Sequence, residues 1–171
     1  MHVRTTATEY NDSMLRPTRA FAVNFTAPET QTVYDDDLLT VTVKKQIDTT
    51  NWDEATTYMD SLGRTVKTRA KDSQGDVFVE TKYDLLGRPH MVTNPYRQGD
   101  TLLWILTEYD EMGRAKQSRE PVANQNPTSP TGNILGVTGY DISTASGFRG
   151  LAVTSTDAAG KKGRSVTNAL G

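Results

Sequence analysis

The chain has 171 residues, of which 35% are hydrophobic and 23% are charged, and its formal net charge is −2. The length suits one ordinary domain, and the composition lies outside the range typical of disordered chains. Interleaved charges of both signs exclude a field that would attract nucleic acid or an anionic membrane. The absence of cysteine excludes disulfides, thiol chemistry and a cysteine-ligated zinc site.

The first 50 residues are expected to form a lead-in β segment with a ragged N-terminus. Strand-like patterns occur near residues 19–25 and near residues 39–46. In the second of these segments Val and Thr alternate. The first residues lack the apolar segment of a signal peptide, and the longest apolar run, residues 102–106, is too short to span a membrane.

The rest of the chain is expected to continue as β structure. Residues 51–122 are interpreted as hairpin repeats, residues 123–139 as a loop rich in Pro, Asn and Gly, and residues 140–171 as further repeats. The chain stops at Gly171, inside what would be another turn. We therefore expect a piece of a longer protein, truncated at its C-terminus.

The recurring motif is Asp-x-x-Gly, which predicts a hairpin turn. Asp favours the first turn position because its carboxylate accepts backbone N–H groups, and Gly favours the fourth because φ is positive there. The first three glycines lie 12 residues apart, which leaves about eight residues, or roughly 27 Å, for each strand. The motif residues are Asp60 and Gly63, Asp72 and Gly75, Asp84 and Gly87, Asp110 and Gly113, and Asp157 and Gly160.

Some of these turns also carry a Tyr before and an Arg after. The pairs are Tyr58 and Arg64, Tyr83 and Arg88, and Tyr109 and Arg114, with one residue inserted after Tyr58. Successive turns of a meander lie at opposite ends of the strands, so these pairs are expected at one end only. Each Arg is expected to lie over the Tyr of its own motif, in a cation–π contact worth about 0.5–1 kcal/mol.

The segments between the turns show the period of two that is typical of strands. Residues 77–83 alternate between two sets of side chains, and residues 102–109 are apolar on both faces. The second pattern predicts that something covers each face of that strand.

Tyr-Asp-x-x-Gly-Arg at intervals of some 20 residues resembles the RHS/YD-repeat family of bacterial surface and toxin-associated proteins, whose animal relatives include the teneurins. The resemblance covers residues 50–122 and returns more loosely near Asp157. It implies a secreted or cell-surface structural shell. Such a shell would enclose or display a C-terminal toxin, or another part of the same polypeptide.

Two other functions remain open. Trp52 and Trp104 could stack on sugar rings as a carbohydrate-binding surface, although packing within the sheet is the favoured interpretation. An enzyme such as a glycosidase has no motif in its favour, because the Asp residues already have a turn role. We therefore expect neither catalytic residues, nor a cofactor, nor a metal site.

Overall fold

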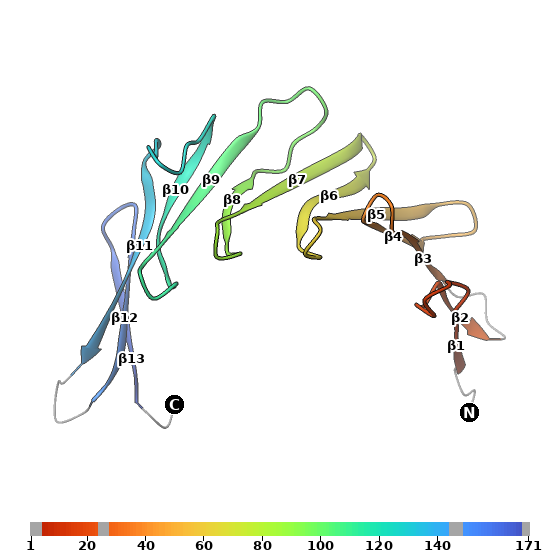
Figure 1. Cartoon of the computed structure of the whole chain (residues 1–171), viewed down its shortest axis with the longest axis horizontal. Helices are drawn as coiled ribbons and strands as arrows, with labels where there is room; N and C mark the ends of the chain where they lie inside the picture. Colours follow the sequence, from red (N-terminus) through yellow and green to blue (C-terminus); the bar gives the residue numbers. More distant parts are fainter. Residues whose placement is uncertain (1–4, 24–27, 144–148, 169–171) are drawn as a thin grey trace. The chain divides into compact units, whose positions relative to one another are not determined.

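The computed structural model describes residues 5–23, 28–143 and 149–168, which contain thirteen β-strands and no helix. The strand order in the sheet, β1 to β13, is the order in the sequence (Figure 1). The predicted all-β meander is confirmed. The expected ragged N-terminus and the turn at Gly171 lie outside the described residues.

The chain divides into two compact units. The first comprises Met1–Thr81 and Pro95–Asp100, and the second comprises Lys82–Asn94 and Thr101–Gly171. The strands of the first unit are β1 (Thr5–Glu9), β2 (Arg19–Val23), β3 (Thr30–Asp35), β4 (Thr40–Gln46), β5 (Trp52–Met59), β6 (Thr65–Asp72) and most of β7 (Gly75–Tyr83). Those of the second are β8 (Pro89–Thr93), β9 (Leu103–Tyr109), β10 (Ala115–Ala123), β11 (Ile134–Ser143), β12 (Gly150–Asp157) and β13 (Lys162–Asn168).

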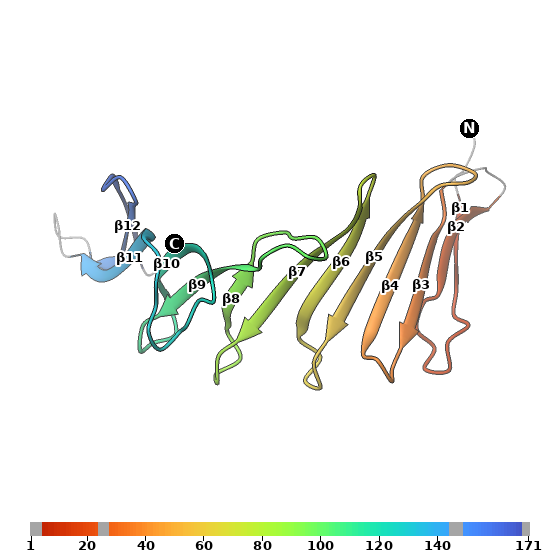
Figure 2. The same ribbon diagram turned by 90° about the horizontal axis from the view of Figure 1, so that it is seen from above.

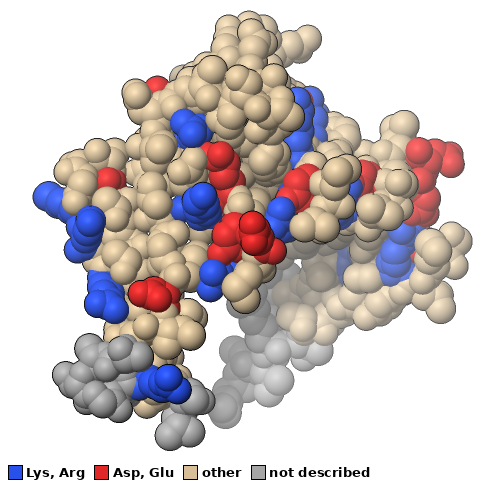
Figure 3. All heavy atoms as spheres, turned by 60° about the vertical axis from the view of Figure 1, so that its left-hand side comes forward, with Lys and Arg blue, Asp and Glu red and all other residues tan. Residues whose placement is uncertain are grey.

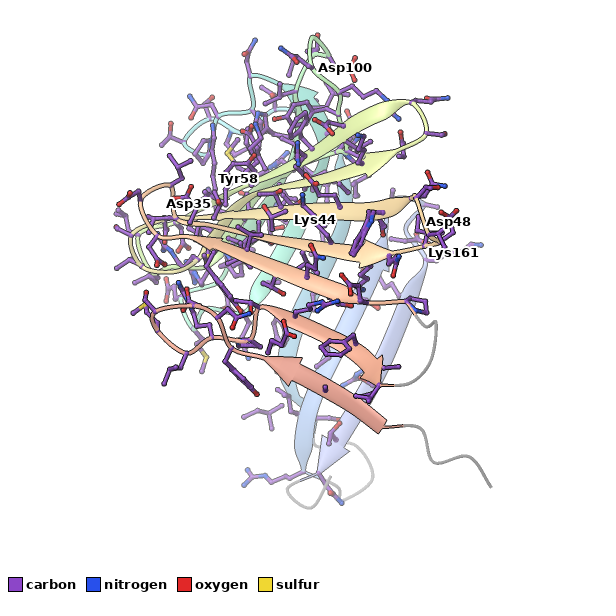
Figure 4. The ribbon with its side chains drawn as sticks, turned by 90° about the vertical axis from the view of Figure 1, so that its right-hand side faces the viewer. Asp35, Lys44, Asp48, Tyr58, Asp100 and Lys161 are labelled. Atoms are coloured by element: carbon purple, nitrogen blue, oxygen red, sulfur yellow. The ribbon has the colours of Figure 1, made fainter. Side chains whose placement is uncertain are left out.

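Because consecutive strands pair antiparallel, successive turns of the first unit alternate between the two ends of the strands. The turns β1/β2 (residues 10–18), β3/β4 (36–39) and β5/β6 (60–64) form one end, which we call the Asp–Arg end (Figure 2). The turns β4/β5 (47–51) and β6/β7 (73–74) belong to the opposite end. In Figure 4, Asp35 and Tyr58 mark the Asp–Arg end and Asp48 the opposite end, with Lys44 between them.

The two faces of the first unit's sheet differ in charge. On the charged face, Lys44 pairs with Glu54 at 3.3 Å, Arg69 also pairs with Glu54, and Arg69 reaches Asp76 at 3.4 Å. On the opposite face, which we call the Val43 face, Lys45 and Asp53 lie across from each other, but the strand register also aligns an uncharged row across β3 to β7, made of Thr32, Val43, Ala55, Ala70 and Val77. A second uncharged row runs through Tyr34, Val41, Thr57, Thr68 and Val79.

The N-terminal segment is more regular than the sequence predicts. The strands expected near residues 19–25 and 39–46 correspond to β2 and β4, and β1 and β3 are additional. The pattern missed their turns because Leu15 and Leu39 take the place of glycine, with φ of 56° and 53°. Non-glycine residues seldom adopt this left-handed conformation, so a search for Asp-x-x-Gly does not find them.

A small apolar cluster in the second unit packs on one face of β9. Trp104 and Leu106 from β9 contact Met91 from β8, and Leu102 packs against them. Leu106 is fully buried, whereas Leu103, one residue before Trp104, is 37% exposed. One face of this strand is therefore buried as expected, whereas the other is only partly covered, because Ile105 on it is half-buried and Leu103 is exposed. Full burial is restricted to alternate side chains.

The predicted loop at residues 123–139 is shorter than expected. Strand β10 ends at Ala123 and β11 begins at Ile134, so residues 134–139 of that segment are strand. Gly136 pairs with Ser118 on β10 and with Asp157 on β12. A glycine-rich segment can extend as a strand when ladders on both sides hold it, and this context is invisible in the local sequence.

Candidate functional site: the Asp–Arg–Tyr array

The hairpin turns share one set of hydrogen bonds. Asp84 Oδ1 accepts the N–H groups of Leu86 and Arg88, both at 2.9 Å. The Gly87 N–H donates to the Asp84 carbonyl at 3.0 Å, and Gly87 has φ of 78°. The turns that start at Asp60, Asp110 and Asp157 repeat these contacts, with Gly63, Gly113 and Gly160 at positive φ. The carboxylate thus replaces backbone partners that a tight turn cannot supply.

In the turns that start at Asp60, Asp84 and Asp110, the second carboxylate oxygen forms an ion pair with the Arg that follows. Arg64 Nε donates to Asp60 at 2.7 Å, Arg88 Nε to Asp84 at 2.6 Å and Arg114 Nε to Asp110 at 2.8 Å. Each Arg also brings a terminal nitrogen to the same oxygen. On the face shown in Figure 3, basic and acidic side chains accordingly lie next to one another.

Hydrogen bonds from these Arg residues lower the carboxyl pKa values. The Arg64 side chain and then its backbone N–H lower the pKa of Asp60, and the Arg114 N–H is the main cause of the lowered pKa of Asp110. At Asp84, burial works to raise the pKa, but the hydrogen bonds from Arg88 outweigh it, so this pKa also falls. The carboxylates therefore remain ionised and bound at neutral pH.

Two of these Arg residues, Arg88 and Arg114, also contact a Tyr of the next hairpin. The guanidinium carbon of Arg88 lies 4.3 Å from the ring centre of Tyr109, and that of Arg114 lies 4.1 Å from Tyr140. The Tyr109 hydroxyl donates to the Pro89 carbonyl at 2.5 Å, and the Tyr140 hydroxyl donates to the Ala115 carbonyl at 3.0 Å. We call this recurring set of Asp, Arg and Tyr the Asp–Arg–Tyr array.

The expectation that Arg114 lies over the Tyr of its own motif is therefore wrong, and the strand register explains why. Tyr109 pairs with Ala115 within its hairpin, so Arg114 lies one residue away from the position opposite Tyr109. Adjacent residues of a strand point to opposite faces. Continuing the pairing of Gln117 with Val137 toward the turn instead brings Arg114 opposite Tyr140.

We expect a double-mutant cycle to separate these two geometries. Substituting Arg114→Met and Tyr140→Leu, singly and together, should reveal a coupling free energy of about 0.5–1 kcal/mol, because the cation–π contact is lost in each single variant. The cycle of Arg114→Met with Tyr109→Leu should give almost no coupling. Urea unfolding measures both. Equal coupling in the two cycles would contradict the observed register.

The array has a copy that the glycine pattern did not reveal. Arg16 pairs with Asp12 at 2.8 Å and with Asp36 at 2.8 Å, and its guanidinium lies 4.1 Å from the Tyr34 ring centre. The Tyr34 hydroxyl donates to the Pro17 carbonyl at 3.1 Å. The spacing Asp-x-x-x-Arg, which residues 12 and 16 share with 60 and 64, 84 and 88, and 110 and 114, is the signal that would have found it.

This copy predicts a pH effect on stability. The Arg16 side chain is the main cause that lowers the pKa of Asp12 to about 2. Because the folded-state pKa lies below the unfolded value of about 4, the stabilisation is complete above about pH 4. It is lost as the pH falls toward about 2.

Urea unfolding of the wild type and Asp12→Asn at several pH values measures this effect. The variant should be less stable than the wild type at pH 5, and the difference should shrink as the pH falls. In an Arg16→Met background the substitution should lose much of its effect. A difference that is constant between about pH 5 and 2.5 would contradict the ion pair as its cause.

The array does not include Tyr58, the Asp72–Gly75 turn or the Asp157–Gly160 turn. Asp72 and Gly75 pair directly across a two-residue hairpin at the opposite end of the first unit, where Arg97 forms an ion pair with Asp72 at 2.6 Å. Tyr58 is the last residue but one of β5, paired with Thr40 and Lys67, near the Asp–Arg end. The Asp157 turn has Lys161 where the other turns have Arg, and it lies at the other end of the strands of the second unit from the Asp110 turn.

The two tryptophans have different surroundings. Trp104 belongs to the apolar cluster, is 7% exposed, and has the Lys82 ammonium 4.3 Å from its ring centre. Its ring is therefore occupied by protein contacts instead of being open to a sugar. Trp52 is half-buried at the start of β5, opposite Gln46.

Within residues 5–23, 28–143 and 149–168, no three acidic or histidine side chains gather closely enough to hold a metal ion. Over the same ranges there is no helix of the length and hydrophobicity needed to cross a membrane.

The fold and the array define an all-β protein built from consecutive antiparallel hairpins that are joined by recurring Asp, Arg and Tyr contacts. Comparison with known protein families and with curated proteins finds no match to this chain.

Proposed function

We propose that this chain is a structural segment of an RHS/YD-type β-shell from a secreted or cell-surface protein. Its sheet would enclose or display another part of the same polypeptide, such as a C-terminal toxin. The observation that carries the proposal is the Asp–Arg–Tyr array. The resemblance rests on the Tyr-Asp-x-x-Gly-Arg motif. Residues of this motif form the Arg–Tyr contacts and the Tyr hydroxyl hydrogen bonds that connect one hairpin to the next.

This use of side chains favours a scaffold over a catalyst. In the array, the carboxylates accept hydrogen bonds from the turn and from Arg, and the Tyr hydroxyls donate to backbone carbonyls. Groups engaged in this way stabilise the sheet and are poorly placed to transfer protons to a substrate.

The two faces of the first unit's sheet carry different kinds of side chain. This difference supports a shell wall with one side toward solvent and the other toward the enclosed segment. The charged face satisfies its charges in cross-strand pairs such as Lys44 with Glu54. The uncharged rows through Val41 and Val43 contain only Val, Ala, Thr and Tyr. Antiparallel sheets commonly keep one face in solvent and cover the other, so the Val43 face, through these two rows, is the one that would contact the enclosed segment.

Single cysteines test this proposal, because the chain has none of its own. Val43→Cys places a thiol on the Val43 face, within its uncharged rows, and Lys44→Cys places one on the charged face of the same strand. In the complete natural polypeptide, a thiol reagent should label position 44 much faster than position 43. In the 171-residue chain alone, both positions should be labelled.

Equal labelling of position 43 in the complete polypeptide and in the isolated chain would contradict a covered face. A glycan array tests the alternative. Reproducible binding that is lost in Trp52→Ala, with the fold intact, would favour carbohydrate recognition over a shell.

A further inference from the structure

Strand β13 leaves one edge of the second unit's sheet open. It is the last strand in the sheet order, so β12 pairs with one side of it and no strand of the described residues pairs with the other (Figure 1). In an antiparallel ladder, every second residue points its N–H and C=O groups away from the existing neighbour. The outer side of β13 therefore offers unpaired backbone groups to which another strand can add.

Two cations on one face of β13 lack an acidic partner. Lys162 and Arg164 are two residues apart, so they point to the same face of the sheet, and both are exposed. On the inner side, Lys162 lies opposite Thr156 and Arg164 lies opposite Thr154. Within the part of the chain that the structure describes, neither cation forms an ion pair.

Lysines on strands of the first unit have acids beside them. All four lysines of β4 and β6 lie directly opposite an acid of a neighbouring strand: Lys44 opposite Glu54, Lys45 opposite Asp53, Lys67 opposite Glu80 and Lys71 opposite Asp76. Two of these, Lys44 with Glu54 and Lys67 with Glu80, are ion pairs at 3.3 Å. Opposite charges in this arrangement stabilise a pair of strands. On β13 the corresponding acids are missing from the inner side, which leaves the open outer side to receive them.

The two cations act differently on different partner strands. Charged side chains at an edge oppose pairing with an apolar or basic strand, because they would lose water or meet like charge. A strand that places Asp or Glu opposite residues 162 and 164 instead gains two cross-strand ion pairs. The same pair of charges therefore selects acidic strands over others.

We propose that the outer edge of β13 binds an extended acidic segment of a partner protein by strand addition. The partner's backbone pairs with the outer N–H and C=O groups, and its acids lie opposite Lys162 and Arg164. Val166 continues the same face, is 38% exposed, and receives an apolar side chain. In an antiparallel partner, the direction in which β12 and β13 pair, the sequence pattern is apolar-x-acid-x-acid.

A polyanion such as a nucleic acid fits this edge less well. It would use the charges of Lys162 and Arg164 but leave the backbone groups of β13 unpaired. The formal net charge of −2 also provides no wider field to attract it. The contact lies at the edge of the second unit and not on the Val43 face, so it holds or fails independently of the proposed shell.

Fluorescence anisotropy with the labelled synthetic peptide Thr-Val-Thr-Glu-Thr-Glu-Thr tests this proposal. The wild-type chain should bind the peptide, and Lys162→Gln/Arg164→Gln should raise the dissociation constant at least about fivefold. The melting temperature of the double variant should not change, because both side chains are exposed and without an ion pair. Lys116→Gln removes an exposed cation from β10, which has strands on both sides, and should bind like the wild type.

A second peptide, methylated on the backbone nitrogens that face β13, keeps the charges but cannot pair, and it should not bind. Equal binding of the two peptides would overturn strand addition and leave charge attraction alone. Equal binding of the first peptide to the wild type and the double variant would place the contact elsewhere. Absence of binding to the wild type would also overturn the proposal, and stronger self-association of the double variant would then assign the cations to protection of the edge.

Discussion

Leu106→Ala is expected to destabilise the protein by about 2–5 kcal/mol, the largest effect of any single substitution considered. Leu106 is 0% exposed and packs with Met91 and Trp104 in the small apolar cluster of the second unit. Truncation removes buried apolar surface and leaves a cavity beside a large aromatic ring. So small a cluster offers few other contacts to replace those that are lost.

Leu103→Ala is the matched control for this prediction. Leu103 lies on the same strand and loses the same atoms, but it is 37% exposed and outside the cluster. We expect its cost to stay below about 1 kcal/mol. Urea unfolding of both variants at one pH measures the difference. Equal costs would show that β9 is covered on both faces, as its sequence pattern first indicated.

Gly63→Val is expected to cost about 1–3 kcal/mol through the backbone alone. Gly63 has φ of 75°, and an added Cβ would meet nothing within 4 Å. Steric conflict of the added Cβ with neighbouring residues is therefore excluded as a cause of the loss. A β-branched residue is especially unfavourable in the left-handed conformation that this turn requires.

Gly63→Asn provides the comparison for that effect, because Asn tolerates positive φ better than other non-glycine residues do. Its cost should be clearly smaller than that of Val. Thermal or urea unfolding distinguishes the two. If Val and Asn were equally costly, side-chain contacts and not backbone conformation would control this turn.

The turns were the most predictable part of the fold. Asp and Gly at fixed spacing determine hydrogen bonds within four or five residues, so Asp84 and Gly87 could be placed at a chain reversal without any tertiary information. Turns that lack glycine escaped because Leu15 and Leu39 adopt left-handed backbone conformations that residue type alone does not indicate. Their strands β1 and β3 were missed with them.

The array itself was only half predictable. The sequence predicted a cation–π contact between Arg and Tyr. Which Arg meets which Tyr, Arg88 with Tyr109 and Arg114 with Tyr140, depends on the register between neighbouring strands. A change of one residue in register would move each Arg to the other face. Tyr34 and Tyr140 were not singled out, because neither is followed by the full motif.

The sequence by itself determined where the motif-bearing turns reverse and that the chain between them is extended. These features depend on local backbone preferences and on a side-chain period of two. Only the tertiary structure decided which Arg meets which Tyr and which face of β9 is buried. Each of these depends on residues from different hairpins, and their alignment is fixed by pairing across strands that no local pattern specifies.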